Sequence, residues 1–121
     1  MKTAELTGAQ LDWAVAKCEG YALTSDGINH LAVRGSEMRI LGPNSSSLHY
    51  SPSTDWAQGG PIIEREKINV SLSATAPWMA WFYDGVEMIW LTDGPTPLIA
   101  AMRCYVASNL GDDVEIPKET T

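Results

Sequence analysis

Apolar side chains recur at helical spacing near both ends of the chain. Between residues 7 and 19 they return every three or four positions along one helix face, which is typical of an amphipathic helix. Thr7 is expected to cap its start and Gly20 to end it. A second helix is expected to begin with Thr96 as its N-cap and to end at Gly111. Both ends of the chain are therefore predicted to be helical.

Charged side chains occupy the opposite face of the first helix. Asp12, Lys17 and Glu19 fall at these positions, which face solvent in an amphipathic helix. Trp13 lies beside the apolar stripe. We expect it either at the edge of the core or on the surface as a contact residue for another molecule. We expect all three charged residues to be exposed.

The segments between the helices carry strand patterns. Residues 30–41 form two short runs around Gly35-Ser36, which indicates a hairpin, and residues 68–73 alternate as in a further strand. The strongest pattern lies in residues 78–91, where two apolar runs flank Asp84-Gly85. Asp-Gly between apolar runs is typical of a two-residue type I′ turn. The sequence therefore predicts a second hairpin with a fixed register.

That register places apolar side chains on both faces of the second hairpin. Trp81 would lie opposite Met88 on one face, and the other face is apolar as well. An antiparallel sheet with one face in water alternates apolar and polar residues, so this hairpin needs two covers. One cover is expected to be a helix. The other is a second helix, the Tyr50–Gly60 loop, a partner subunit or a ligand.

These elements predict an α+β fold, in which an antiparallel sheet with the 78–91 hairpin at its centre is packed by an N-terminal and a C-terminal helix. Residues 1–111 are expected to form one domain, and residues 112–121 an acidic, disordered tail. No apolar run is long enough to span a bilayer and no leader pattern opens the chain. We therefore expect a soluble, intracellular protein without a membrane partner.

Composition and charge narrow the classes of partner. The formal net charge is −7, which argues against duplex nucleic acid because phosphate backbones are bound through clustered Lys and Arg. The negative net charge does not argue against a small anionic ligand bound in a local pocket. His30 and His49 have no Cys or carboxylate at metal-ligand spacing, and no nucleotide-binding or nucleophile motif is present. We therefore expect no metal, no cofactor and no catalytic residue.

The most informative stretch is residues 50–67, which combine a Trp, several hydroxyls, an Asp, two glycines and two prolines between strands. We expect a short helical turn from Ser53, a break at Gly59-Gly60 and a new turn from Pro61. Loops of unusual composition often carry recognition residues. The candidate ligand-binding residues are Tyr50, Ser53, Thr54, Asp55, Trp56, Glu64 and Arg65, with Trp81 from the hairpin. Two of these residues have structural alternatives to ligand binding. Asp55 could be a carboxylate at the start of a helix, and Glu64 could be a solvated surface charge.

The same stretch carries a resemblance. Asp55-Trp56, the Pro61-Ile-Ile-Glu64 helix start and the later Pro97-Leu-Ile-Ala-Ala-Met102 segment are similar to motifs of the NinX-like proteins of lambdoid phages. The likeness covers roughly residues 50–110. It implies a phage product in the bacterial cytoplasm, and it strengthens Asp55, Trp56 and Glu64 as candidates. It implies no particular reaction.

Three functions are compatible with these residues. The first is a phage accessory protein, for example one that acts in counter-defence. It would sequester a small nucleotide-derived ligand in an aromatic-lined pocket without catalysis, with Arg65 or Arg103 meeting a phosphate. The second is an inhibitor that presents the aromatic 50–60 loop to a host enzyme, with the negative charge steering it to a basic target. The third is a small hydrolase that uses Asp55 or Glu64.

Overall fold

The computed structural model describes residues 1–25, 30–41, 49–75 and 77–116. The predicted loop at residues 42–47 and the last five residues of the tail lie outside this part. The elements follow in the order η1 (Thr3–Glu5), α1 (Gly8–Cys18), β1 (Ala22–Ser25), β2 (His30–Arg34), β3 (Glu37–Leu41), α2 (Trp56–Glu66), β4 (Asn69–Leu72), β5 (Trp78–Tyr83), β6 (Met88–Gly94) and α3 (Pro97–Leu110).

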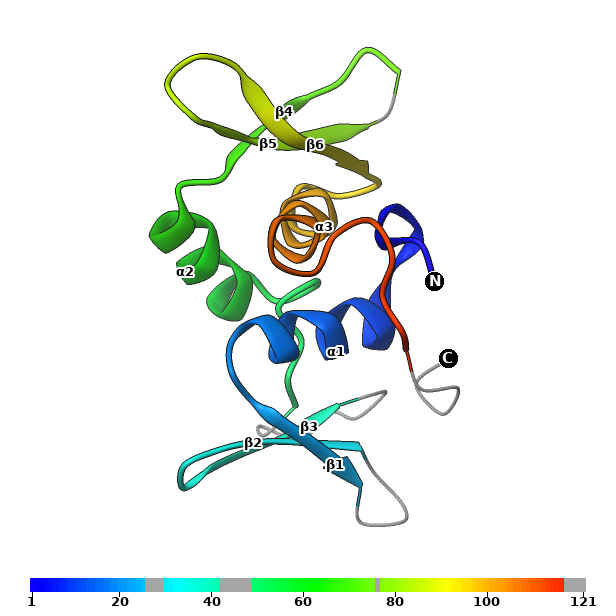
Figure 1. Cartoon of the computed structure of the whole chain (residues 1–121), viewed down its shortest axis with the longest axis vertical. Helices are drawn as coiled ribbons and strands as arrows, with labels where there is room; N and C mark the ends of the chain where they lie inside the picture. The colour runs from blue at the N-terminus through cyan, green and yellow to red at the C-terminus, as the bar shows by residue number, and fades with distance from the viewer. Residues whose placement is uncertain (26–29, 42–48, 76, 117–121) are drawn as a thin grey trace.

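The elements are stacked in four layers. Figure 1 shows the β1–β2–β3 sheet at one end, then α1, then α3, and the β4–β5–β6 sheet at the other end, with α2 beside the two central helices. The α+β class and the two terminal helices are confirmed. The strands form two antiparallel sheets rather than the single sheet we expected, because α1 and α3 lie between them and each sheet covers one side of the helical pair.

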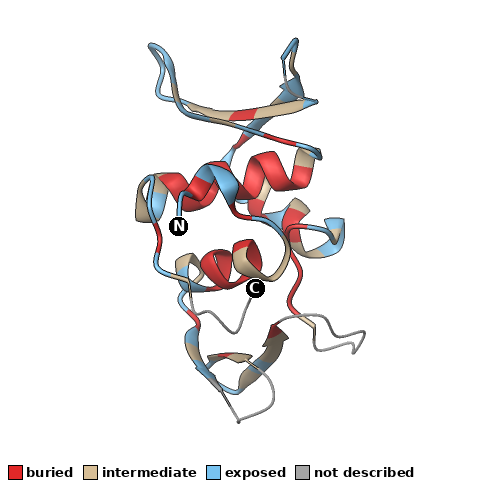
Figure 2. Ribbon diagram, turned by 90° about the vertical axis from the view of Figure 1, so that its right-hand side faces the viewer, coloured by how far each residue is buried: buried red, intermediate tan, exposed pale blue. Residues whose placement is uncertain are grey.

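The central position of α3 explains its composition. Every residue from Leu98 to Ala107 is buried, as Figure 2 shows. A helix that is covered all round is mostly apolar, and Arg103 is the one charged residue of α3. Its ends follow the predicted local signals. The Thr96 hydroxyl accepts a hydrogen bond of 3.1 Å from the Ile99 amide, and Gly111 follows the last turn.

The first helix begins after Thr7 and ends before Gly20 as predicted, but the capping hydrogen bond expected at its start is missing. Gly20 has φ of 87°, and the Tyr21 amide donates back to the Ala16 carbonyl at 3.1 Å, which closes the last turn. At the start, the Thr7 side chain makes no capping hydrogen bond. The prediction that the Thr7 side chain caps this helix is therefore wrong, although Thr7 holds the N-cap position.

Helix α2 runs through the expected break. Gly59, Gly60 and Pro61 all lie inside one continuous helix, so the prediction of two separate turns is wrong. Gly59 is required by packing, since a Cβ there would lie 2.3 Å from the Pro52 carbonyl oxygen and 2.6 Å from Leu98 Cδ2. The glycine therefore marks a close approach of α2 to its neighbours and not a stop.

The second hairpin has a different register from the predicted one. Its turn spans four residues, because the Asp84 carboxylate accepts hydrogen bonds of 2.8 Å from the amides of both Val86 and Glu87. Tyr83 consequently pairs with Met88. A bulge then shifts the pairing opposite Trp81, so the predicted Trp81–Met88 pair does not form.

The chain beyond α3 returns to the N-terminal segment. The Thr3 amide donates to the Asp112 carbonyl and the Val114 amide to the Met1 carbonyl, both at 2.9 Å, and Val114 is buried. Disorder from Asp112 onward was expected, and residues 112–114 do not follow that expectation. The packed chain therefore extends past the end of α3.

Candidate functional site

The start of the 50–67 segment belongs to the core. Tyr50 is buried, with its ring centroid 5.3 Å from that of Tyr21. Burial raises the pKa of the Tyr50 hydroxyl well above its usual range. Tyr50 was a candidate binding residue, but its ring is not available to a ligand in this conformation.

Ser53 is held by a buried carboxylate. Its amide donates a hydrogen bond of 2.9 Å to Oδ1 of Asp12, which is only 3% exposed, so the prediction that Asp12 faces solvent is wrong. Burial raises the pKa of Asp12 to about 6, although hydrogen bonding from Ser53 opposes the shift. The Ser53 hydroxyl lies close to this carboxylate, yet it makes no hydrogen bond of normal geometry with the described residues.

Asp55 caps the second helix. Its Oδ1 accepts from the Ala57 amide at 3.0 Å and its Oδ2 from the Gln58 side chain at 3.1 Å. This arrangement satisfies an otherwise free amide in the first turn and places a negative charge at the positive end of the helix. Asp55 therefore fills its structural alternative, that of a carboxylate at the start of a helix.

Three of the predicted residues meet around a small pocket. It has a volume of about 180 Å³ and is lined by Ser53, Thr54, Trp56, Thr96 and Leu98. Trp56 is 56% exposed. The pocket offers hydroxyl groups and one indole, but it is smaller than the roughly 300–1,000 Å³ of most small-molecule sites.

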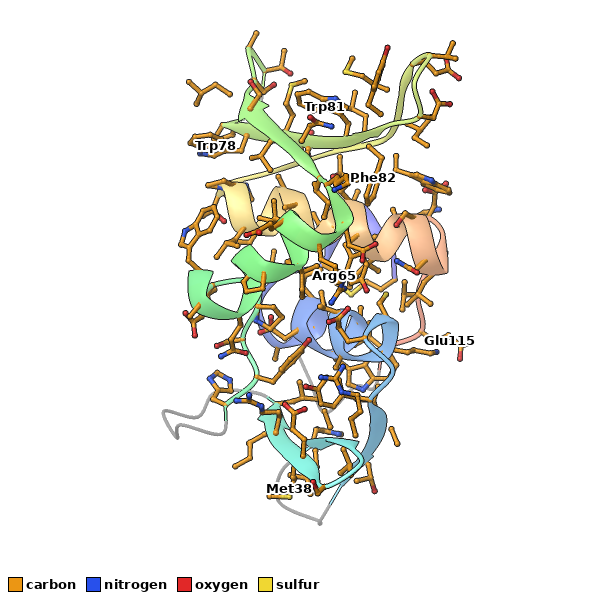
Figure 3. The ribbon with its side chains drawn as sticks, turned by 90° about the vertical axis from the view of Figure 1, so that its left-hand side faces the viewer. Met38, Arg65, Trp78, Trp81, Phe82 and Glu115 are labelled. Atoms are coloured by element: carbon orange, nitrogen blue, oxygen red, sulfur yellow. The ribbon has the colours of Figure 1, made fainter. Side chains whose placement is uncertain are left out.

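The other predicted residues lie elsewhere. Arg65 points from α2 towards α1 (Figure 3). Its Nη1 donates to the carboxylate of Glu19 at the end of α1 at 3.0 Å, and its Nη2 donates to the hydroxyl of Tyr105 in α3 at 3.2 Å. Tyr105 also donates to Glu19. Burial raises the pKa of Glu19, but the hydrogen bonds from Arg65 and Tyr105 outweigh it and hold that pKa below its usual range. Glu64 is exposed on α2. Arg65 is therefore occupied by an internal ion pair.

Trp81 belongs to a separate surface. Figure 3 shows its ring on the side of the β4–β5–β6 sheet away from α3, whereas Phe82 points towards α3. We call this side the outer face. We define it by the apolar outward residues Met79, Trp81, Tyr83 and Met88, together with the two exposed bulge residues opposite Trp81 in the ladder, Trp90 and Leu91. Tyr83, Met88, Trp90 and Leu91 are 42–61% exposed. No described element covers the outer face, and the Tyr50–Gly60 segment lies away from it.

The outer face has acidic and no basic neighbours in sequence. Residues 68–102 contain Asp84, Glu87 and Asp93 but no Lys, Arg or His. Hydrogen bonds from the Glu87 and Val86 amides hold the pKa of Asp84 below its usual range. The outer face is therefore an apolar, aromatic surface whose charged neighbours in sequence are acidic.

A larger hollow adjoins the outer face. Its volume is about 690 Å³, and η1, the β4–β5 connection, β6 and the end of α3 contribute its walls. It is lined by Lys2, Thr3, Ala4, Glu5, Ser73, Thr75, Met79, Leu91, Thr92, Asp93, Ala107 and Asp112. The sequence does not predict this hollow, because segments distant in the chain build it and such a site has no local sequence motif.

The described residues contain no group of three His, Cys, Asp or Glu side chains that could hold a metal ion. Cys18 and Cys104 are free, and burial raises the pKa of both thiols to about 12. Among the described residues, none of the helices is long and apolar enough to cross a membrane.

Comparison with known proteins extends the resemblance to nearly the whole chain. No curated protein matches it. The sequence model of the family described as Bacteriophage P22, NinX matches residues 2–109. The match runs from η1 to the last turn of α3 and so includes both sheets and all three helices. The chain therefore belongs to the phage NinX family.

Proposed function

We propose that this phage protein acts in the host bacterial cytoplasm by binding another protein, and that the outer face is its contact surface. The observation that supports this proposal is the gathering of large, exposed apolar side chains on one face of one sheet. Scattered exposed apolar residues are ordinary, but a contiguous group marks an interaction site. Trp and Tyr also dominate the energetically important positions of protein interfaces.

The backbone at Trp90 adds support. Its φ is 55°, a conformation that bulky residues rarely adopt because the side chain crowds the backbone. The residue nevertheless stays 42% exposed and so gains only part of the burial energy of a core ring. Strained residues of this kind cluster at functional sites. A surface role accounts for a large ring at this position better than core packing does.

The sequence led us to expect the protein-binding surface in the 50–60 loop, whereas we now place it on the β4–β5–β6 sheet. Of the aromatic residues in that loop, Tyr50 is buried and Trp56 alone is exposed. A single ring beside a small pocket is a weaker protein-binding surface than the outer face.

A photo-crosslinking experiment in infected cells tests the proposal. A benzophenone amino acid at Tyr83 or Met88, both on the outer face, is expected to give one discrete product containing a host or phage protein. The same group at Glu64, which is exposed on α2, serves as the matched control and should give none. A product at Glu64 but none at Tyr83 or Met88 would contradict the proposal.

A second candidate function is capture of a small, nucleotide-derived ligand without altering it. The observation in its favour is the pocket at Ser53, where a buried hydroxyl makes no hydrogen bond of normal geometry with the described residues and the Trp56 ring offers a stacking surface. The pocket volume suits a base or a sugar, with the remainder in solvent. No observation on the described residues favours a hydrolase, since Asp55 serves as a helix cap.

Thermal shift against a nucleotide panel tests this second function. A rise of several degrees with one compound, recovered unchanged and abolished by Trp56→Ala, supports capture. Conversion of the compound would instead support an enzyme. No shift with any compound favours the protein partner.

A further inference from the structure

We infer that the partner inserts a long cationic side chain, Arg or Lys, into the hollow beside the outer face. The contact segment of the partner is then an apolar stretch that carries a neighbouring basic residue. This inference rests on the proposed function, because it describes what the outer face binds.

The hollow and the outer face form one continuous surface. Met79 and Leu91 belong to the outer face and also line the hollow, and Asp93 lies next to Met79 across the β5–β6 ladder. A chain lying on the apolar face therefore reaches the hollow without crossing a ridge of other elements. The volume of about 690 Å³ is ample for one long side chain.

The charges in the hollow favour a cation. Three acidic residues are among its lining residues, Glu5, Asp93 and Asp112, and none of their carboxylates forms an ion pair within the described part of the chain. Lys2 is the one basic residue among the lining residues, and its ammonium lies 4.0 Å from the carboxylate of Asp113. The carboxylates are thus left with little internal neutralisation.

Asp93 has one further cationic neighbour, which is buried. The guanidinium of Arg103 donates to the Asp93 carbonyl at 2.8 Å and to the Leu6 carbonyl at 2.9 Å, and it does not line the hollow. Burial lowers the pKa of Arg103, while the nearby charge of Asp93 opposes the shift. Arg103 is therefore part of the wall behind the hollow.

The chemistry of an Arg or Lys side chain matches both parts of the surface. Its aliphatic stem can lie along Met79 and Leu91 while its charged head meets the carboxylates. A second copy of this chain fits poorly, since it would bring the same acidic rim and a formal charge of −7 against an equal charge.

Selection from a random peptide library tests the inference. The library is panned on the protein and counter-selected on the Tyr83→Asp/Met88→Asp variant, whose outer face is blocked. Enrichment of peptides with an apolar core and an adjacent Arg or Lys supports the inference. Enrichment of apolar peptides without a basic residue retains the proposed function but overturns the inference. Acidic peptides overturn it as well, and peptides that bind both proteins equally overturn the proposed function too.

A matched set of variants measures the charge itself. Replacing the Arg of a selected peptide by citrulline, which keeps its shape and removes its charge, is expected to weaken binding about tenfold. Glu5→Gln/Asp93→Asn should remove this difference, whereas the control Glu64→Gln/Glu115→Gln should preserve it. Equal affinity of the Arg and citrulline peptides for the unaltered protein would overturn the inference.

Discussion

The carboxylate of Asp12 in α1 accepts a hydrogen bond of 2.9 Å from the main-chain amide of Ser53, 41 residues later in the chain. Both residues are buried. The bond therefore joins the first helix to the segment that leads into α2, and it does so inside the protein. Because a buried carboxylate is costly when ionised, the stability of this junction depends on pH.

Asp12→Asn is expected to stabilise the protein near neutral pH. The pKa of Asp12 is about 6 in the folded protein against an ordinary 3.8, so the folded state binds more protons between these values. The free energy of unfolding then falls as pH rises from about 4 to about 6. Asn keeps an oxygen acceptor for the Ser53 amide and removes the charge. We expect a gain of roughly 1–3 kcal/mol at neutral pH.

Urea unfolding at about pH 4 and about pH 7, followed by Trp fluorescence, provides the measurement. Asp12→Asn should also flatten the pH dependence between these two conditions. Asp12→Ala is the comparison, since it removes the acceptor and leaves the Ser53 amide unpaired, at a cost of about 1–3 kcal/mol. An Asn variant that is less stable than the parent at neutral pH would sink this explanation.

Arg65→Met is expected to destabilise the fold without the involvement of any ligand. Its guanidinium pairs with Glu19, whose side chain is largely buried, while Arg65 itself is half exposed. We expect a loss of about 1–2 kcal/mol, reduced by solvent screening of Arg65. The pKa of Glu19 is held low, so the contribution of this pair is present above its unfolded pKa and is lost as pH falls.

A double-mutant cycle with Glu19→Gln measures the coupling between the two side chains. Chemical denaturation of the parent, the two single variants and the double variant gives the four free energies. Additive losses would show that the pair does not stabilise the fold, and would free Arg65 for a binding role.

Trp56→Ala is expected to leave the free energy of unfolding within about 1 kcal/mol of the parent, because the ring is more than half exposed. A ring that filled the core would cost about 3–5 kcal/mol instead. Thermal melting distinguishes these outcomes. The companion Asp55→Ala should lose about 1 kcal/mol through the helix cap, and Asp55→Asn much less.

Trp90→Gly separates surface function from stability. Glycine adopts the φ of 55° without strain, and this gain offsets the packing lost with the ring. We expect a melting temperature close to that of the parent, together with loss of the crosslinked product formed from Tyr83. A fall of stability by more than about 2 kcal/mol would assign the ring to the core.

Val114→Ala is expected to destabilise the protein by about 1–2 kcal/mol, because Val114 is 5% exposed and packs in the main core. The neighbouring exposed residue gives the control, and Glu115→Ala should change stability by less than about 0.5 kcal/mol. Equal melting temperatures for both variants would contradict this prediction and agree with the disordered tail that the sequence led us to expect.

The local signals of the sequence determined the ends of two helices and the identity of most strands. Thr96 and Gly111 delimit α3 as expected, and Gly20 closes α1, because caps depend on contacts within one turn. The apolar runs at residues 78–91 gave strands, and the motifs around Asp55-Trp56 pointed to the family whose model matches residues 2–109.

Tertiary packing decided the rest. The apolar pattern of α1 places Asp12 on the polar side of the helix, which predicts exposure to solvent. Asp12 is nevertheless buried, because the 50–55 segment packs over it. Gly59 is a helix breaker by propensity, yet it lies inside α2 because only glycine fits against Pro52. Propensity acts within a few residues, and burial acts between segments that are distant in the chain.

The candidate site divides in the same way. The composition of residues 50–56 identified Ser53, Thr54 and Trp56, which do meet at one pocket. The apolar pattern of residues 78–91 indicated a face in need of a cover, and the outer face is that surface. Its register, its bulge at Trp90 and the hollow beside it were set by the four-residue turn and by the N-terminal segment packing near β6. Hydrophobic patterning specifies which residues avoid water, and only the packed chain decides which of them are covered.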